Sequence, residues 1–208
     1  MSTRKERRAA AREGILAAAH RQLADGGCAS ASVAAVAERA GVATGSIYRH
    51  FPSRAELLAE VVGDALRGEH ALLAHAVEGL TPRAALAAWV TTTVERARRA
   101  PVLTRALLDE PADRAVFAVR LRERAAQEQT LASLLDDGAR TGAWPPGDAA
   151  LQAAAITGAL LGAVVGRAAA ALGPRPDARA EAQGLVAFVL GAVDARPDGA
   201  RELPPRTV

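Results

Sequence analysis

Apolar residues recur three and four positions apart along the chain, which is the spacing of one helix face. The first such stripe comprises Ile15, Leu16, Ala19 and Leu23, and it predicts an opening helix. The glycine pair that follows Asp25 predicts the end of this helix, because glycine favours the left-handed conformation of a C-terminal cap.

A second apolar stripe occupies residues 33–40 and stops at Gly41, where a C-terminal cap needs a positive φ. A short third helix is predicted next, with Ile47 and Phe51 four residues apart. Two helices joined by so short a turn cross steeply, as in a helix-turn-helix unit, and the later helix projects outward. Its other side chains offer hydroxyls, a guanidinium and an imidazole, which suit phosphates and base edges: Thr44, Ser46, Tyr48, Arg49 and His50.

Hydroxyl residues stand where the helices of this region begin. Ser32 precedes the second helix and can cap its free N–H groups, and the same helix end can receive a phosphate. Ser53, with Glu56 three residues later, predicts a capping box at the start of a fourth helix. Ala43 cannot cap the third helix, so Thr44 is expected to do so.

The remaining chain reads as a series of longer helices separated by proline and glycine. Pro82 opens one of them, and Pro101 and Pro111 bracket a short one. Residues 112–139 form a single long helix in this interpretation, followed by a loop at residues 144–147. Asp148 caps a helix that extends to about Leu172, where residues 173–176 stop it, and Asp177 starts a last helix that ends near Val193.

Composition points to the same fold class. Hydrophobic residues make up 50% of the chain but aromatic residues only 3%, so the core is built from Ala, Leu and Val. Such a core favours closely packed helices over a sheet. We therefore expect an all-α protein with a helix-turn-helix domain at residues 1–62, a larger helical domain at residues 63–195 and a disordered tail at residues 196–208.

Basic residues are concentrated at the helix-turn-helix end. Residues 1–54 carry nine Arg or Lys and four Asp or Glu, whereas the remainder holds 17 basic and 19 acidic residues. A short basic arm at residues 2–8 is expected to fray and to reach phosphates or a minor groove. The distribution favours a polyanionic partner, namely DNA, although a solvated charged terminus would look similar without the motif.

Cysteine content and hydropathy indicate the compartment. Cys28 is the only cysteine, which excludes an internal disulfide and favours a reducing cytosol. The polar, basic residues 1–12 do not form a secretion signal. The least charged stretch, residues 149–166, is too short to span a bilayer and is interpreted as a buried helix. We therefore expect a cytoplasmic protein without a membrane segment.

Residues 8–62 resemble the tetracycline-repressor (TetR) family of bacterial transcriptional regulators. The resemblance rests on the apolar residues of the first helix and on two spaced runs, Ser32–Val42 and Gly45–Phe51, followed by Ser53-Arg54 and Leu57-Leu58. One departure is Ala43, where the family often has a capping Ser. The resemblance implies a ligand-responsive regulator, most simply a repressor, that binds a palindromic operator as a dimer and is released by a small-molecule effector.

The resemblance also implies roles for individual residues. The recognition helix would run from about Thr44 to His50, with Arg49 the main base-reading residue. Base edges would be contacted by Thr44, Gly45, Ser46 and Arg49, and the DNA backbone by Ser32, Tyr48, His50 and Arg54. A purely structural role is an alternative for several of them: Phe51 is expected to be core, Tyr48 to pack its ring while exposing its hydroxyl, and His50 to be either a phosphate ligand or an ordinary surface histidine.

Gly158, Gly162 and Gly166 recur every fourth residue in the penultimate helix. Glycine costs about 1 kcal/mol in a helix interior relative to alanine, so another backbone is expected to approach this row closely. In the TetR family the last two helices form a four-helix dimer interface, and the row fits it. Tight packing within one subunit is the alternative.

An effector pocket is expected in the second domain, where aromatic and hydroxyl side chains interrupt an aliphatic background. The candidates are His70, His75, Trp89, Thr92, Thr93, Phe117 and Trp144. The two histidines are five residues apart and do not share a helix face, so no metal is proposed, and no cofactor is expected.

Two other classes of function are alternatives to a ligand-responsive regulator. A helical enzyme needs a nucleophile with its base or a carboxylate pair, and no such constellation or Gly-rich phosphate loop is evident. An architectural DNA binder without ligand control would not need so long a second domain.

Overall fold

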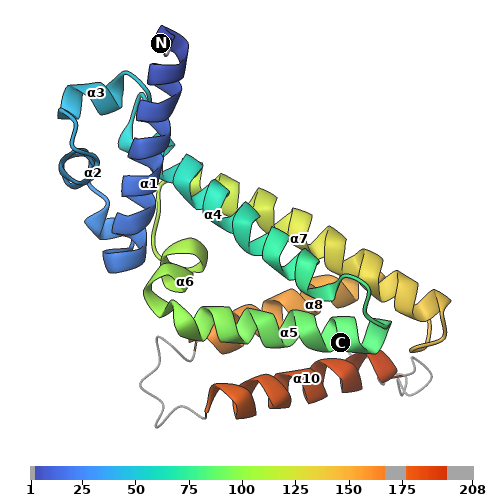
Figure 1. The fold of residues 1–208 in the computed structure, drawn as a ribbon. Coiled ribbons are helices and arrows are strands. Elements are labelled where there is room, and N and C mark those ends of the chain that lie inside the picture. The colour runs from blue at the N-terminus through green and yellow to red at the C-terminus, as the bar shows by residue number, and fades with distance from the viewer. Residues whose placement is uncertain (1–2, 167–176, 196–208) are drawn as a thin grey trace, which may run out of the picture.

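The computed structural model describes residues 3–166 and 177–195, and every regular element in this part of the chain is a helix (Figure 1). This confirms the all-α prediction. The helices are α1 (Arg4–Ser30), α2 (Val33–Ala40), α3 (Thr44–Tyr48), α4 (Arg54–Val77), α5 (Pro82–Arg99), α6 (Pro101–Leu108), α7 (Arg114–Arg140), α8 (Ala149–Leu161), the π-helix η1 (Gly162–Gly166) and α10 (Ala178–Asp194).

Most of the predicted caps form. Gly41 has φ 66° at the end of α2, and the Ser32 hydroxyl accepts a hydrogen bond from the Ala35 N–H at its start. Ser53 likewise accepts from the Glu56 N–H at 3.2 Å, so the structure shows the serine half of the predicted capping box. Asp148 caps α8 in the same way. Side-chain acceptors therefore fix the starts of α2, α4 and α8.

The amino-terminal arm differs from the prediction. It is helical from Arg4 onward instead of frayed, because Thr3 and Glu6 form a capping box that satisfies the first N–H groups of α1. The predicted stop after Asp25 is found: Gly27 has a non-helical conformation with φ 73° and divides α1 at a kink, beyond which only the short piece up to Ser30 follows. The basic side chains of the arm are thus carried on a helix.

The start of α3 also corrects the sequence interpretation. Ala43 occupies the N-cap position without any side-chain hydrogen bond, and Thr44 is the first helical residue, so Thr44 does not cap the helix. The α-helical part of the penultimate helix ends at Leu161 and continues as the π-helix η1. The predicted end at Leu172, the stop at residues 173–176 and the tail at residues 196–208 lie outside the described residues.

The helix-turn-helix unit, α1 to α3 with the start of α4, projects from one end of the molecule (Figure 1). Helix α4 runs from this unit into the rest of the protein, packed along α7, and passes the predicted domain boundary at residue 62 without a break. Helices α5, α8 and α10 complete the second bundle. No helix in the described ranges has both the length and the hydropathy needed to cross a membrane.

Two hydrophobic clusters form the interior. One lies under the helix-turn-helix unit, yet it includes Ala106 and Leu107 of α6 and Val116 of α7. The other surrounds Trp89 and Leu131 in the second bundle. Because α6 and α7 supply part of the first cluster, the helix-turn-helix unit rests directly on the second bundle.

Candidate nucleic-acid interface and ligand cavity

Helix α3 buries only one of its side chains. Ile47 is 1% exposed and anchors the helix to the core, whereas Thr44 and Gly45 are exposed and Ser46 is partly exposed. Tyr48 is 53% exposed, so its ring is not packed into the core as predicted. Almost the whole of this short helix therefore faces solvent.

Several polar side chains at this surface have no partner among residues 3–166 and 177–195. Thr44, Ser46, Tyr48 and Arg49 make no side-chain hydrogen bond or ion pair within the described part of the chain, although each carries a donor. Arg49 follows α3 directly and is exposed. These groups are available to an external partner.

His50 follows α3 and lies within electrostatic range of Arg8 and Arg12 of α1 and of Arg49. Burial lowers its pKa below the ordinary value, and the positive charges of Arg8, Arg12 and Arg49 lower it further. Its Nδ1 atom is buried without a hydrogen-bond partner in the described structure. The neighbouring Phe51 is 2% exposed, which confirms that it is a core residue. Cationic groups from α1 and α3 thus converge on one surface.

Ser32 and Arg54, which flank α3 in the sequence, differ in their surroundings. Ser32 is exposed at the start of α2, where its hydroxyl is occupied as a cap. The Arg54 guanidinium donates to the carbonyl oxygens of Ala31, at 3.1 Å, and Cys28, and it lies 3.8 Å from Asp113. Arg54 therefore ties α4 to the end of α1 and to the segment before α7.

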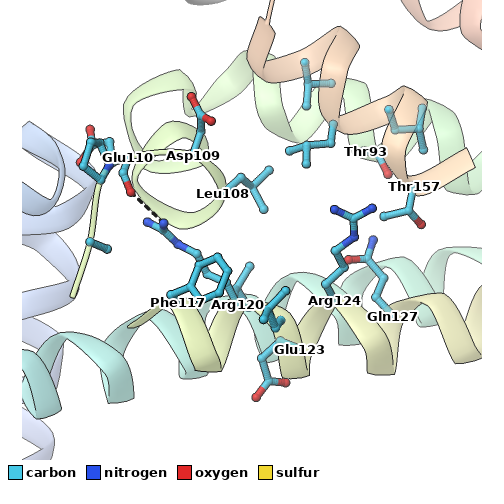
Figure 2. A pocket seen from close by; sticks show the side chains of 17 residues that line it. Thr93, Leu108, Asp109, Glu110, Phe117, Arg120, Glu123, Arg124, Gln127 and Thr157 are labelled. Atoms are coloured by element: carbon cyan, nitrogen blue, oxygen red, sulfur yellow. Dashed lines mark hydrogen bonds between the residues drawn. The ribbon is translucent and has the colours of Figure 1, made fainter. Parts of the chain in front are cut away.

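A cavity of about 420 Å³ opens between the helices of the second bundle (Figure 2). A smaller cavity of about 160 Å³ adjoins it and shares several lining residues. Together they fall within the usual size of a small-molecule site. The apolar lining of the larger cavity includes Leu66, Leu108, Phe117, Leu121, Leu160, Leu161 and Val164, and its polar lining includes Thr93, Asp109, Glu110, Arg120, Glu123, Arg124, Gln127 and Thr157.

Two of the predicted pocket residues line this cavity. Thr93 comes from α5, and its hydroxyl donates to the Trp89 carbonyl oxygen at 2.8 Å. Phe117 comes from α7 and is 57% exposed, so its ring borders the opening.

The other pocket candidates lie elsewhere. Trp89 is fully buried in the second hydrophobic cluster, and Trp144 packs against Gly138 and donates from Nε1 to the Leu135 carbonyl oxygen. Both tryptophans fill core volume. His70 bonds to the Thr130 hydroxyl at 2.8 Å, His75 is exposed beside Glu78, and Thr92 is not part of the lining.

The sequence interpretation missed the polar residues of α7 and α8 that line the cavity. It did not assign any charged residue of the predicted helix at 112–139 to the pocket, but Arg120, Arg124 and Gln127 share one face of α7 with Phe117. The helical spacing of these residues was a usable signal. The spacing alone does not show where α8 lies, and it is α8 that places Thr157 opposite this face of α7 (Figure 2).

One group of contacts joins the cavity wall to the helix-turn-helix unit. Glu110, at the cavity, accepts a hydrogen bond from the Cys28 N–H in the last turn of α1 at 2.6 Å. Arg120 donates to the carbonyl oxygens of Glu110, at 2.7 Å, and Ala106, at 2.6 Å (Figure 2). A Cβ on Gly27 would stand 2.4 Å from Glu110 Oε1, so only glycine fits there without a shift. Burial, and the Glu110 carboxylate after it, raises the pKa of the Cys28 thiol.

The glycine row makes little contact within the described part of the chain. A Cβ on Gly162 would meet nothing within 4 Å, and one on Gly158 would meet only Arg124 Nη2 at 3.9 Å. Gly162 is exposed, and Gly166 ends η1. Within the described residues, packing inside one subunit does not account for Gly158 and Gly162. The described residues also contain no cluster of three potential metal ligands.

An exposed third helix, carried on a three-helix unit and joined to a helical bundle with a cavity, defines a helix-turn-helix protein with a second, ligand-sized site. Residues 15–61 match the family model described as bacterial regulatory proteins, tetR family. The helix-turn-helix unit is therefore a TetR-family DNA-binding domain, and the resemblance found in the sequence is confirmed. No curated protein matches the sequence significantly.

Solved structures show that the whole fold is of the TetR type. The transcriptional regulator FadR from Bacillus subtilis, in complex with stearoyl-CoA, superposes with a TM-score of 0.74 at 18% identity, over 87% of this chain and 98% of that chain. RolR in complex with resorcinol superposes with a TM-score of 0.68 at 23% identity, over 99% of this chain and 98% of that chain. A TetR-family regulator from Agrobacterium tumefaciens superposes with a TM-score of 0.71 at 21% identity, over 90% of this chain and 100% of that chain.

Proposed function

We propose that this chain is a cytoplasmic, ligand-responsive transcriptional repressor that binds a palindromic operator as a homodimer and is released by a small molecule. The observation that carries the proposal is the surface at α3, where donors without a protein partner stand beside the cationic turns of α1. Such a surface suits the phosphate backbone and the base edges of duplex DNA. No reaction is assigned to the chain.

The proposed contacts follow the exposure of each residue. Arg49 reads base edges together with Thr44, Gly45 and Ser46, since a guanidinium can pair bidentately with guanine. Tyr48, His50 and Ser32 contact phosphates. Arg54 positions the unit through the carbonyl oxygens that it already binds, and any phosphate contact by Arg54 is made from that anchored position.

Dimerisation is proposed to use the outer faces of α8, η1 and α10. Gly162 is exposed there, a Cβ on it would meet nothing within 4 Å among the described residues, and Phe188 of α10 is 59% exposed. A second subunit would cover both, and the two-fold pairing would space two recognition helices for a palindrome. Replacing Gly162 by Leu should shift the protein to monomer in light scattering, whereas an unchanged dimer would contradict this interface.

Ligand response is proposed to pass through Glu110 and Arg120. Both residues line the cavity, and Glu110 holds the end of α1 through the Cys28 N–H. A ligand that moves this segment would also move α1 and, with it, the orientation of α3. The ligands named for FadR and RolR, stearoyl-CoA and resorcinol, support a site for small molecules in this fold.

The proposal can be tested with duplexes selected from random DNA by the full-length protein. Arg49→Ala should weaken binding to the selected duplex by about 1–3 kcal/mol and relax its sequence preference, measured by fluorescence anisotropy. Arg39→Ala is the matched control, because Arg39 lies in the same unit but is paired with Asp25. Equal affinity and selectivity in the parent and Arg49→Ala would refute the assigned recognition helix.

A further inference from the structure

Polar groups lie at both ends of the cavity (Figure 2). Arg124 and Gln127 of α7 stand opposite Thr157 of α8 at one end, and Asp109, Glu110 and Arg120 lie at the other. Both terminal nitrogens of Arg120 bond to backbone carbonyl oxygens. A ligand that fills the cavity meets Arg124 and Thr157 at one end and also contacts the apolar lining, which includes leucines, Val164 and Phe117.

Thr157 has a hydroxyl group without a partner. Its Oγ1 is buried and makes no hydrogen bond in the described structure. Thr93, which also lines the cavity, donates to the carbonyl oxygen four residues earlier in its own helix. A buried hydroxyl left unpaired costs free energy, so an acceptor supplied by a ligand would remove this cost.

Arg124 supplies the positive charge at this end. Its Nε donates to Glu128 at 2.8 Å, but neither terminal nitrogen has a hydrogen-bond partner within the described residues. A Cβ built on Gly158 would lie 3.9 Å from Arg124 Nη2, which places the guanidinium against α8 beside Thr157. Two guanidinium nitrogens and a hydroxyl thus face one small volume.

The carboxylates of the cavity wall do not cancel this charge. Glu123 accepts from Arg67 at 2.9 Å and from Arg122 at 2.8 Å, and although burial opposes the shift, these hydrogen bonds lower its pKa. Glu110 is engaged by the Cys28 N–H. Asp109 is exposed at the end of α6. Arg120, the other cation of the lining, uses both terminal nitrogens on backbone carbonyl oxygens. Arg124 is ion-paired with Glu128 through Nε, which leaves its two terminal nitrogens for a ligand.

We propose that the cavity binds an amphipathic carboxylate, with the carboxylate on Arg124 and Thr157 and the apolar body along α6, α7 and α8. A guanidinium pairs with a carboxylate through two parallel N–H groups, which a neutral head group cannot reproduce. The role of this molecule as the effector rests on the proposed function, but its binding does not.

The first test compares matched probes by calorimetry on the full-length protein. Dodecanoate and 2-naphthoate are each titrated beside the neutral alcohol of the same skeleton and the corresponding amine. At least one carboxylate should bind about 10-fold or more tightly than its alcohol, as expected for a charge-assisted hydrogen bond. Equal or tighter binding of the alcohols or amines, or no binding of either carboxylate, would overturn the proposal.

Substitutions locate the head group. Arg124→Met should weaken the bound carboxylate by about 10- to 100-fold and leave the alcohol unchanged, and Thr157→Val should weaken it by about 3- to 10-fold. Glu128→Gln removes the Arg124 ion pair but keeps the guanidinium, so carboxylate binding should persist. Arg140→Met removes an exposed charge from the same helix outside the cavity and should also have no effect. Unchanged carboxylate affinity in Arg124→Met would overturn the proposal.

Failure of the proposed ligand class can be distinguished from failure of the proposed regulator function. If the selected duplex binds and is released by neutral compounds alone, the ligand class is wrong and the regulator proposal stands. If carboxylates bind in an Arg124-dependent way while no duplex is bound selectively, the ligand class stands and the regulator proposal fails.

Discussion

The helix-turn-helix unit and the second bundle use their polar side chains in opposite directions. In the first, α3 buries only Ile47 and turns its donors outward over a closed core. In the second, Arg124, Gln127 and Thr157 turn inward toward a cavity. An outward array suits a long polyanion, and an inward one encloses a small molecule.

The two regions meet in a thin layer of contacts. Leu107 of α6 and Val116 of α7 belong to the core under α1, and Glu110 between these helices bonds to the Cys28 N–H. A change in the cavity wall therefore has a short physical route to α1. The following predictions test how far the two regions are in fact separate.

The largest effect is expected from Leu107→Ala. Leu107 lies outside the predicted helix-turn-helix domain but is 3% exposed within its core, so the substitution should lower the free energy of unfolding by about 2–5 kcal/mol. Leu108→Ala, at a 38% exposed neighbour, should cost less than about 1 kcal/mol. Denaturant unfolding measures both. Equal small effects would mean that residues 1–62 are stable without α6.

Gly27→Ala should cost about 1–3 kcal/mol. The alanine would have to adopt a positive φ, and its Cβ would displace the Glu110 carboxylate. Gly14→Ala in the same helix meets nothing within 4 Å and should stabilise the protein by about 0.5–1 kcal/mol. The melting temperatures of the two variants should shift in opposite directions. An unchanged melting temperature in Gly27→Ala would contradict the contact with Glu110.

Glu110→Gln should reduce communication between the regions by about 1 kcal/mol. The amide keeps the shape of the side chain but replaces a charge-assisted hydrogen bond to the Cys28 N–H by a neutral one. The measured quantity is the ratio of duplex affinities with and without a bound carboxylate. Asp109→Asn, the exposed neighbour, should leave this ratio unchanged. The same ratio in Glu110→Gln as in the parent would exclude this contact from the coupling.

The smallest effect concerns His50 and pH. In the free protein burial and nearby arginines lower its pKa, whereas a bound phosphate favours the imidazolium, so DNA binding raises this pKa. Duplex affinity should therefore increase as pH falls from 8 through the bound-state pKa and level off below the free-state pKa. His50→Gln should reduce this increase, by less than about fivefold in affinity. His20→Gln, at an exposed position of α1, should not.

The sequence predicted the parts of the fold that depend on local chemistry. Gly41, Ser32, Ser53, Asp148 and the prolines each act on their own helix end, and the structure has these helix ends close to the predicted positions. The arm at residues 2–8 was predicted wrongly because the capping box of Thr3 and Glu6 was not recognised.

The cavity could be predicted only in part, because its lining depends on which helix packs opposite α7. Trp89 and Trp144 were chosen for being rare aromatics, but their volume fills the core. Arg120 and Arg124 were not among the pocket candidates, and only the position of α8 shows that Arg124 faces Thr157. Arg54 similarly binds carbonyl oxygens that lie more than 20 residues away in the sequence.

The most direct test of the account is reciprocal linkage between the two regions. The dissociation constant of the selected duplex is measured with and without a saturating carboxylate, and that of the carboxylate with and without the duplex. We expect the carboxylate to weaken duplex binding and the duplex to weaken carboxylate binding by the same factor, about 5- to 150-fold. A duplex affinity that does not change at saturating carboxylate would contradict control of the helix-turn-helix unit by the cavity.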